Sequence, residues 1–314
     1  MLYLDESRVR AVLQLDELID ALEQAFLDLA TGQATNLVRR RVRTTSAMLH
    51  LMGAASRRAN LLVYKAYSTS TEGAWFRVHA YRGDNGLPLA ELQADWLGRL
   101  RTGAASAVSV KHMARPEARV LGVIGAGRQA ETQIAAIARV RPLEAIYVYS
   151  RNPERCRRFA DRIAQQYHLP IQTVPTAQAA VADADIVVTI TTAAQPVLFG
   201  EWLRDGAHIC AVGSNSLQRC EIDVSVLHRT ALVAVDSVEQ ARIEAGDLAE
   251  PIAQGLLHWD QLVPLEQIVA GRTPGRHDPA DITLFESLGI GLEDLAATDL
   301  VLRKTLQELQ YWSL

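Results

Sequence analysis

The chain has 314 residues, of which 49% are hydrophobic and 22% charged, and its formal net charge is -4. These values are typical of a globular protein of one large or two ordinary domains, and they give no electrostatic basis for binding nucleic acid or an anionic membrane surface. No apolar run reaches the length of a membrane span, and residues 1–16 lack the apolar stretch of a signal peptide, so we expect a cytoplasmic protein without a membrane segment. The three cysteines, Cys156, Cys210 and Cys220, lack metal-ligand spacing, so we expect neither a disulfide nor a metal site.

The N-terminal region has the pattern of a mixed α+β domain. Residues 11–30 place apolar side chains at helical spacing behind Asp16, a possible N-cap, and predict an amphipathic helix. Between about residues 37 and 92, short apolar runs such as MLHLM, LLVYKAY and WFRVHAY are separated by polar turns. This pattern predicts antiparallel strands.

From Val120 onward, strand-like runs alternate with helical stretches. The runs are VLGVI, IYVYS, ADIVVTI, HICAVG and ALVAVD. Such alternation predicts an α/β fold with a doubly wound parallel sheet and right-handed crossovers. Residues 280–310, after Pro274, are predicted to be helical and to pack back onto the first region.

A glycine-rich turn follows the first of these strands. Residues 121–133 read LGVIGAGRQAETQ, in which Gly125, Gly127 and Ala130 form G-x-G-x-x-A between strand and helix. In that context Gly125 makes the tight turn, Gly127 lets the backbone approach a pyrophosphate, and Ala130 packs the helix on the strand. The turn predicts a dinucleotide site, the alternative being a βα turn without a ligand. Its candidate contacts are Gly125, Ala126, Gly127, Arg128 and Gln129.

The end of the next strand bears on which dinucleotide binds. NAD sites usually place an acidic residue there, whereas this chain has Ser150, Arg151 and Asn152. A serine hydroxyl and a guanidinium suit a 2′-phosphate, so the sequence favours NADP(H), with NAD(H) possible. Asn152 is equally suited to cap the helix that follows.

Three further residues are candidates for cofactor contact. Thr189 and Thr191 end the strand ADIVVTITT, at the edge where doubly wound sheets bind ligands, although threonines there can simply terminate the strand. Thr102 lies in a small-residue stretch, which core packing explains equally well.

Four ordered motifs resemble the ornithine cyclodeaminase and mu-crystallin family over almost the whole chain. They are RTGAASAVSVKHMA from Arg101, GVIGAGRQA, HICAVGSN, which contains the candidate cofactor residue Gly213, and DITLFESLGIGLEDLA from Asp281. The resemblance implies a homodimer of two-domain subunits. It predicts a substrate and dimerisation domain formed by residues 1–112 and completed by a C-terminal helix at about 293–314, and an NAD(P)-binding Rossmann domain formed by residues 113–292.

The same resemblance implies where a small amino or imino acid binds. Arg101 matches a substrate arginine, Lys65 the pocket lysine, and Arg39 a second arginine, with Arg41 as the alternative register. An arginine fork suits a substrate carboxylate because it binds in bidentate fashion. The alternatives are a solvated basic face for VRRRVR and a lysine whose ammonium reaches water.

One departure from the family pattern decides between activities. The cyclodeaminases carry an aspartate where this chain has Asn215, and an amide cannot act as a general base. We therefore expect Lys65, Arg101 and Asn215 to serve an NAD(P)H-dependent reduction of cyclic ketimines, such as pyrroline-2-carboxylate or piperideine-2-carboxylate, to L-amino acids. The alternatives are ornithine cyclodeamination, with Asp247 as a substitute base, an alanine-type dehydrogenase, and a noncatalytic crystallin-like NADP-binding protein.

Overall fold

The computed structural model describes residues 1–308 and divides into two compact units. The first joins residues 1–105 to the chain from Gly289 onward, and the second is Ser106–Leu288, so that one boundary falls within helix α3 (Asp95–Met113). Residues 309–314 of the predicted C-terminal helix lie outside the described residues.

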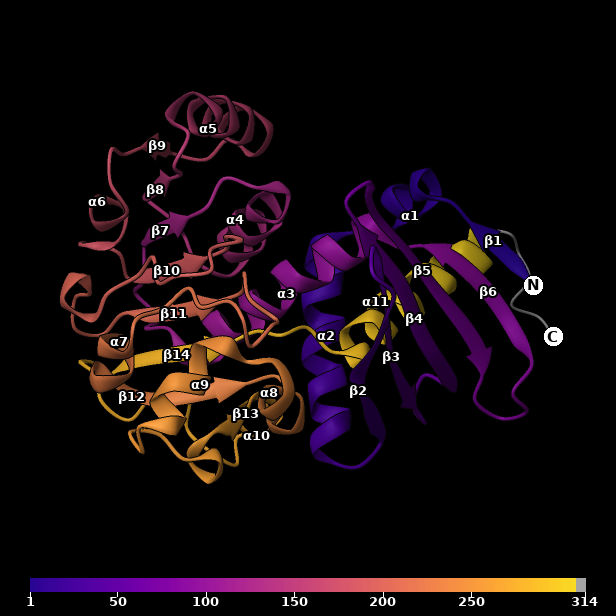
Figure 1. Ribbon diagram of the computed structural model, residues 1–314. Coiled ribbons are helices and arrows are strands. Elements are labelled where there is room, and N and C mark those ends of the chain that lie inside the picture. The colour runs from indigo at the N-terminus through magenta and orange to yellow at the C-terminus, as the bar shows by residue number, and fades with distance from the viewer. Residues whose placement is uncertain (309–314) are drawn as a thin grey trace. The chain divides into compact units, whose positions relative to one another are not determined.

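The first unit contains a six-stranded sheet with the order β1-β6-β5-β4-β3-β2 (Figure 1). Strand β1 pairs with β6 in parallel, and the other pairs are antiparallel, as predicted for residues 37–92. The strands are β1 (Leu2–Leu4), β2 (Ala34–Arg43), β3 (Ala47–Ser56), β4 (Leu61–Ser70), β5 (Gly73–Arg82) and β6 (Pro88–Gln93).

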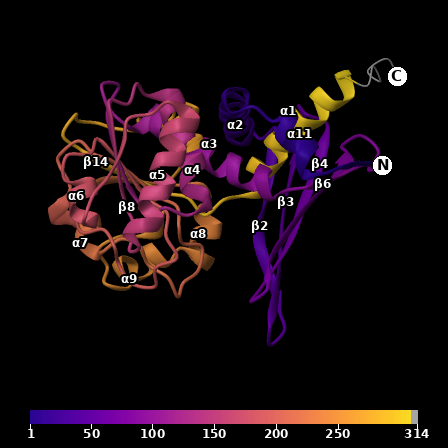
Figure 2. The same ribbon diagram turned by 90° about the horizontal axis from the view of Figure 1, so that it is seen from above.

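The helices of the first unit gather on one face of this sheet. Helix α11 (Gly291–Glu308) packs on β2, β3 and β4 and against helix α2 (Leu15–Ala30), as Figure 2 shows. The predicted helix over residues 11–30 is wrong at its start. Helix α1 (Glu6–Val12) ends before extended Leu13, and Asp16 lies in the first turn of α2 rather than at its N-cap, which is Gln14.

The second unit is a doubly wound parallel sheet, as predicted, with the order β13-β12-β14-β11-β10-β7-β8-β9. The order reverses between β7 and β10, which makes the carboxyl ends of these strands the switch point of the sheet. The strands are β7 (Val120–Ile124), β8 (Ala145–Tyr149), β9 (Ile171–Thr173), β10 (Ile186–Thr189), β11 (His208–Ala211), β12 (Thr230–Val235), β13 (Val263–Pro264) and β14 (Ile282–Glu286).

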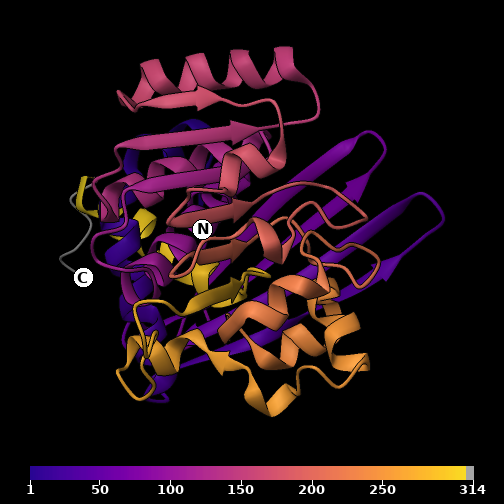
Figure 3. The same cartoon turned by 90° about the vertical axis from the view of Figure 1, so that its left-hand side faces the viewer.

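Helices cover both faces of this sheet, and Figure 3 shows α5 running along its β8 and β9 edge. The helices are α4 (Arg128–Val140), α5 (Pro153–Tyr167), α6 (Ala177–Val181), α7 (Val224–Arg229), α8 (Val238–Glu244), α9 (Gly246–Ala253) and α10 (Leu265–Val269), with 3-10 turns η1 (Gly200–Trp202) and η2 (Trp259–Gln261).

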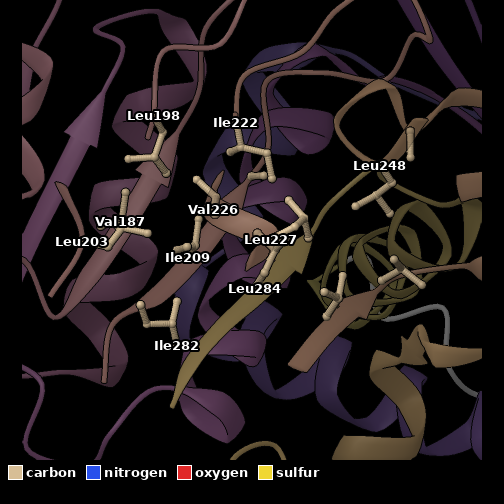
Figure 4. Close-up of a cluster of buried hydrophobic side chains, with 14 of the residues drawn as sticks. Val187, Leu198, Leu203, Ile209, Ile222, Val226, Leu227, Leu248, Ile282 and Leu284 are labelled. Atoms are coloured by element: carbon tan, nitrogen blue, oxygen red, sulfur yellow. The ribbon is translucent and has the colours of Figure 1, made fainter. Parts of the chain in front are cut away.

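Alternate residues of the central strands enter two separate cores. On β10, Ile186 and Val188 join the core under α3, α4 and α5, whereas Val187 joins the core under α6, α7 and α9 (Figure 4). A strand buried on both faces reads as a continuous apolar run, because successive side chains point in opposite directions. The sheet is thus buried on both sides, and its carboxyl edge is where loops can hold a ligand.

The prediction that residues 280–310 are helical is wrong in its first part. Residues Ile282–Glu286 form β14, which pairs in parallel between β11 and β12, and every residue of it is buried. A short apolar run buried on both faces cannot be told from a buried helix by periodicity alone. Among the described residues, no helix combines the length and apolar character needed to cross a bilayer.

Candidate functional site

The glycine turn has the geometry that a dinucleotide site needs. Gly125 has a φ of +123°, and a Cβ there would lie 2.4 Å from the carbonyl oxygen of Ile190. Gly127 is the N-cap of α4, and a Cβ there would meet no atom within 4 Å, so the backbone faces open space. Ala130 is fully buried, while Arg128 and Gln129 are exposed. A pyrophosphate fits this turn, because the amides of a helix N-terminus point into accessible space.

The end of β8 is tied to the glycine turn. The amide of Gly125 donates to the carbonyl oxygen of Tyr149 at 2.8 Å, which places Ser150 and Arg151 directly beyond that bond. Ser150 is half-buried and Arg151 exposed. The side chain of Asn152 accepts from the amide of Arg155 at 2.9 Å and caps α5, which confirms the capping interpretation.

The carboxyl ends of β10 and β11 hold the other predicted cofactor residues of this unit. Thr189 is fully buried, and within residues 1–308 its hydroxyl has no hydrogen-bond partner. Thr191 and Gly213 both donate to the buried carboxylate of Glu221, a residue that sequence reasoning missed. The three cofactor candidates therefore lie at one edge of the sheet.

In the first unit, Lys65 lies inside the protein rather than reaching water. Its side chain, on the helix-covered face of β4, is 3% exposed, and Nζ donates to Oδ1 of Asp294 at 3.0 Å. Burial and the charges of Arg101 and Arg39 lower the pKa of Lys65 to about 8, against the opposing effect of Asp294. Lys65 is thus a stronger acid than an ordinary lysine.

Arg101 is held between two adjacent carboxylates of α11. Its Nη1 donates to Glu293 at 2.5 Å and its Nε to Asp294 at 3.2 Å, and all three side chains are buried. Burial raises the pKa of Glu293. The pKa of Asp294 is lowered, because Arg101 and Lys65 beside it outweigh the effect of burial.

Gly289 lets Arg101 approach the backbone closely. Its φ is +73°, and a Cβ there would lie 2.4 Å from Nη1 of Arg101. The carbonyl oxygen of the same residue accepts from Nη2 of Arg39 at 2.7 Å. One glycine therefore contacts both arginines for which a substrate role was predicted.

A β-bulge explains why Arg39 rather than Arg41 joins this group. Val38 and Arg39 are consecutive in sequence yet both buried, because the register of β2 on β3 shifts between Leu37 and Arg40. Arg41 instead donates to Nδ1 of His50 at 3.1 Å. Arg39 is 3% exposed, so it does not belong to a solvated basic face.

The buried group of Arg39, Lys65, Arg101, Glu293 and Asp294 is called the lysine-arginine cluster below. With every member ionised it holds three cations and two carboxylates, which leaves one net positive charge to attract an anion. His50 is a poor candidate for a proton donor at neutral pH, because burial and the charges of Arg41 and Arg39 lower its pKa to about 4 and keep it mostly uncharged.

Three other candidates are accounted for individually. Thr102 belongs to the first unit, where its hydroxyl donates to the carbonyl oxygen of Gly98 at 2.8 Å. Asn215 belongs to the second unit and lies half-buried in the loop after β11. Oδ1 of Asp247, the alternative base, accepts from the amides of Glu221 and Ile222 at 2.5 and 2.9 Å, and within residues 1–308 its Oδ2 has no hydrogen-bond partner. The cofactor role of Thr102 and the catalytic role of Asn215 stay predictions.

Sequence reasoning missed the acidic half of the cluster. Asp294 closes the motif that begins at Asp281, yet it received no role, and Glu293 precedes it. The available signal was two adjacent acids in an otherwise apolar stretch, since charged residues there are costly unless paired. Across residues 1–308, no three His, Cys, Asp or Glu side chains come together in a way that could hold a metal ion.

The sequence profile described as "Ornithine cyclodeaminase/mu-crystallin family" matches residues 2–308. A Delta(1)-pyrroline-2-carboxylate reductase of Bacillus cereus is 38% identical over 71% of this chain and 67% of its own. An iminosuccinate reductase of Paracoccus denitrificans is 33% identical over 96% and 95%. The structure of Thermococcus litoralis Delta(1)-pyrroline-2-carboxylate reductase in complex with NADH and L-proline superposes with a TM-score of 0.94, at 32% identity and 98% coverage of both chains. The chain belongs to the ornithine cyclodeaminase/mu-crystallin family.

Proposed function

We propose that this protein is a nicotinamide-dinucleotide-dependent reductase of small cyclic α-imino acids, which it converts to L-amino acids. The observation that carries the proposal is the lysine-arginine cluster, in which a buried lysine with a pKa of about 8 lies among two arginines and two carboxylates. The names of the relatives, reductases of pyrroline-2-carboxylate and of iminosuccinate, agree with it. Pyrroline-2-carboxylate and its six-membered homologue are the first substrates to test.

Each group of the cluster has a role in this reaction. The net positive charge, carried by Arg101 and Arg39, holds the substrate carboxylate. A bound reduced dinucleotide supplies the hydride to the imine carbon. Lys65 donates the proton that the imine nitrogen gains, and Asp294 keeps its ammonium oriented. The first unit therefore binds substrate, and the second, through Gly125, Gly127 and the residues at its sheet edge, binds the dinucleotide.

Asn215 separates reduction from cyclodeamination. Cyclodeamination moves several protons and expels ammonia, which requires a titratable group, whereas reduction of a preformed ketimine requires one proton donor. Asn215 has no useful pKa, so it favours the reductase, in which we assign it the role of a hydrogen-bonding group. Only Oδ1 of Asp247 is bonded to backbone amides, so Asp247 is tested directly by the ornithine assay below.

The test measures oxidation of NADPH and NADH by the purified protein over cyclic imino acids and over 2-oxo acids supplied with ammonia. We expect steady turnover with a five- or six-membered cyclic ketimine. When the protein is incubated with ornithine and a catalytic amount of dinucleotide, we expect it to form neither proline nor ammonia. Robust ammonia release from ornithine with negligible ketimine reduction would establish the cyclodeaminase instead. Binding of dinucleotide without any turnover would favour a noncatalytic protein.

Cofactor preference is a finer part of the proposal. Ser150 and Arg151 follow β8, where an acidic residue would repel a 2′-phosphate, so we propose that NADPH is preferred over NADH. Asn152 contributes chiefly by capping α5, and Arg128 is an exposed second candidate for the phosphate.

Ser150→Asp is expected to narrow or reverse this preference, because the new carboxylate repels the 2′-phosphate and accepts from a ribose hydroxyl. The ratio of kcat/KM for NADPH to that for NADH should fall by at least about tenfold, or about 1.4 kcal/mol. Ser150→Asn is the matched control, since an asparagine side chain has the shape of an aspartate without its negative charge. Better use of NADH by the unaltered protein would contradict the assignment.

The first unit also supports a homodimer. The sheet face opposite its helices exposes large apolar side chains, among them Leu49, Leu51, Leu62, Tyr64 and Trp75, each at least 38% exposed. Such a patch marks an interaction surface, and we propose that a second copy of this chain covers it. Light scattering should give twice the subunit mass, and a stable monomer at micromolar concentration would exclude this assembly.

The cysteines fit a reducing compartment. Cys156, Cys210 and Cys220 are free thiols, and the first two are buried. Because disulfides are rare in the cytosol and the proposed reaction consumes a reduced dinucleotide, we propose a cytoplasmic enzyme. Fractionation of the native cells checks the location.

A further inference from the structure

One buried carboxylate joins the ends of two neighbouring strands in the second unit. Oε1 of Glu221 accepts from both the amide and the hydroxyl of Thr191, each at 2.6 Å, and Oε2 accepts from the amide of Gly213 at 2.6 Å. Thr191 lies just beyond β10 and Gly213 just beyond β11, which are paired in the sheet. Glu221 therefore fixes the backbone of two loops at the carboxyl edge.

The two loops meet so closely that only glycine fits at position 213. A Cβ on Gly213 would lie 2.4 Å from the carbonyl oxygen of Thr191 and 2.5 Å from both carboxylate oxygens of Glu221. A displacement of either loop therefore breaks a hydrogen bond to the carboxylate. Three short bonds and this close contact determine the positions of both loops together.

The backbone of Glu221 is held in place by a second buried carboxylate. Oδ1 of Asp247, at the start of α9, accepts from the amides of Glu221 and Ile222. Burial raises the pKa of Glu221 to about 7, with the charge of Asp247 adding to the effect and the hydrogen bonds from Thr191 and Gly213 opposing it. Two buried carboxylates are costly unless they are hydrogen-bonded, so the arrangement depends on these amide donors.

The position of these loops assigns them to one half of a dinucleotide. In a doubly wound sheet, the half on each side of the switch point binds one mononucleotide, and the strand that follows the glycine turn contacts the adenosine ribose. The half that contains the glycine turn and the following strand is β7, β8 and β9, so this half binds the adenosine. β10 and β11 lie on the other side of the switch point and belong to the nicotinamide half.

We infer that Glu221 is a positioning residue for the nicotinamide half of the cofactor, which it supports by holding the loops of Thr191 and Gly213. The inference rests on the dinucleotide site proposed above, and it adds a role for a side chain that belongs to neither the glycine turn nor the lysine-arginine cluster. Loss of Glu221 should weaken binding of the whole dinucleotide without weakening binding of its adenosine fragment.

The test replaces Glu221 by Gln. An amide presents one oxygen and one NH2, so in either orientation a donor faces the amide of Thr191 or of Gly213. Calorimetric titration of the wild-type protein and the variant at the same pH would compare NADPH with adenosine 2′,5′-bisphosphate, and NADH with ADP. We expect the Kd of the dinucleotides to rise at least about tenfold and that of the fragments to stay within about twofold.

Asp185→Asn is the matched control. Asp185 is another buried carboxylate of the same unit, and its Oδ2 accepts from the amides of Arg119 and Val120 at 2.8 and 3.0 Å while Oδ1 bonds Arg115. It directly precedes β10 and holds the amino end of β7, the opposite end of the sheet from the ligand edge. This variant should lower Tm and leave all four Kd values within about twofold.

The outcomes separate this inference from the proposed function. Equal weakening of fragments and dinucleotides by Glu221→Gln, or no weakening of either, would overturn the positioning role. The titrations need no imine, so a wild-type protein that binds dinucleotide but reduces no ketimine would refute the proposed substrate and leave this test intact. If Glu221→Gln does not fold, Glu221→Asp keeps the charge on a side chain too short to reach both loops, and the same pattern of affinities is expected.

Discussion

Lys65→Met is expected to lower kcat/KM for a cyclic ketimine by about 10³-fold, because it removes the proposed proton donor. The variant should lose stability, because Asp294 loses one of its two buried cations, but the fold should survive, since Asp294 keeps its bond to Arg101 and a methionine fills the space of the buried lysine stem. Dinucleotide affinity, measured by calorimetry, should not change. Lys304→Met is the matched control, because Lys304 is also in the first unit and pairs with the carboxylate of Glu17.

The pH dependence of the wild-type enzyme tests the same role. The folded-state pKa of Lys65 is about 8, below its ordinary value of 10.5, and the protonated form is the donor. Activity should therefore be full below about pH 8 and fall about tenfold per unit above it. Lys65→Arg, whose guanidinium stays protonated, should be slower, and its activity should no longer fall between about pH 8 and 10. The same fall in Lys65→Arg, or intact catalysis by Lys65→Met, would remove Lys65 from the mechanism.

The sequence predicts the second unit well because its signals are local. The glycine turn, the alternation of strands and helices, and the Asn152 cap each depend on residues adjacent in the chain, and each appears in the structure. β14 was misassigned because a strand buried on both faces has no period that separates it from a buried helix.

The lysine-arginine cluster depends instead on contacts between residues far apart in the chain. A bulge in β2 brings Arg39 to the buried face, and no local pattern in VRRRVR marks that shift. The partners of Lys65 and Arg101 come from α11, some two hundred residues away. Glu221 likewise acquires its role only when β10 and β11 are paired. Such partners are set by tertiary packing, so the sequence predicts the cations and not the carboxylates that hold them.

Arg101→Met is expected to damage both stability and catalysis, for separable reasons. The variant leaves Glu293 and Asp294 buried with one cation fewer, and removing one partner of a buried ion pair typically costs about 4 kcal/mol. It also removes a charge-assisted contact to the substrate carboxylate worth about 2 kcal/mol, which lowers kcat/KM about 30-fold. Urea unfolding and steady-state kinetics measure the two effects.

The double variant Arg101→Met/Glu293→Gln separates the two effects of Arg101. It removes one positive and one negative charge together, so the buried group again has one more cation than carboxylate if Arg39 and Lys65 remain protonated beside Asp294. Stability should recover most of the loss, because no unpaired carboxylate is left where Nη1 of Arg101 had been. Catalysis should stay low, because the guanidinium that binds the substrate is still missing, while dinucleotide affinity stays within about twofold of wild type. Recovery of kcat/KM together with stability would mean that Arg101 serves only to neutralise Glu293 and Asp294, and that the substrate carboxylate is bound by other residues.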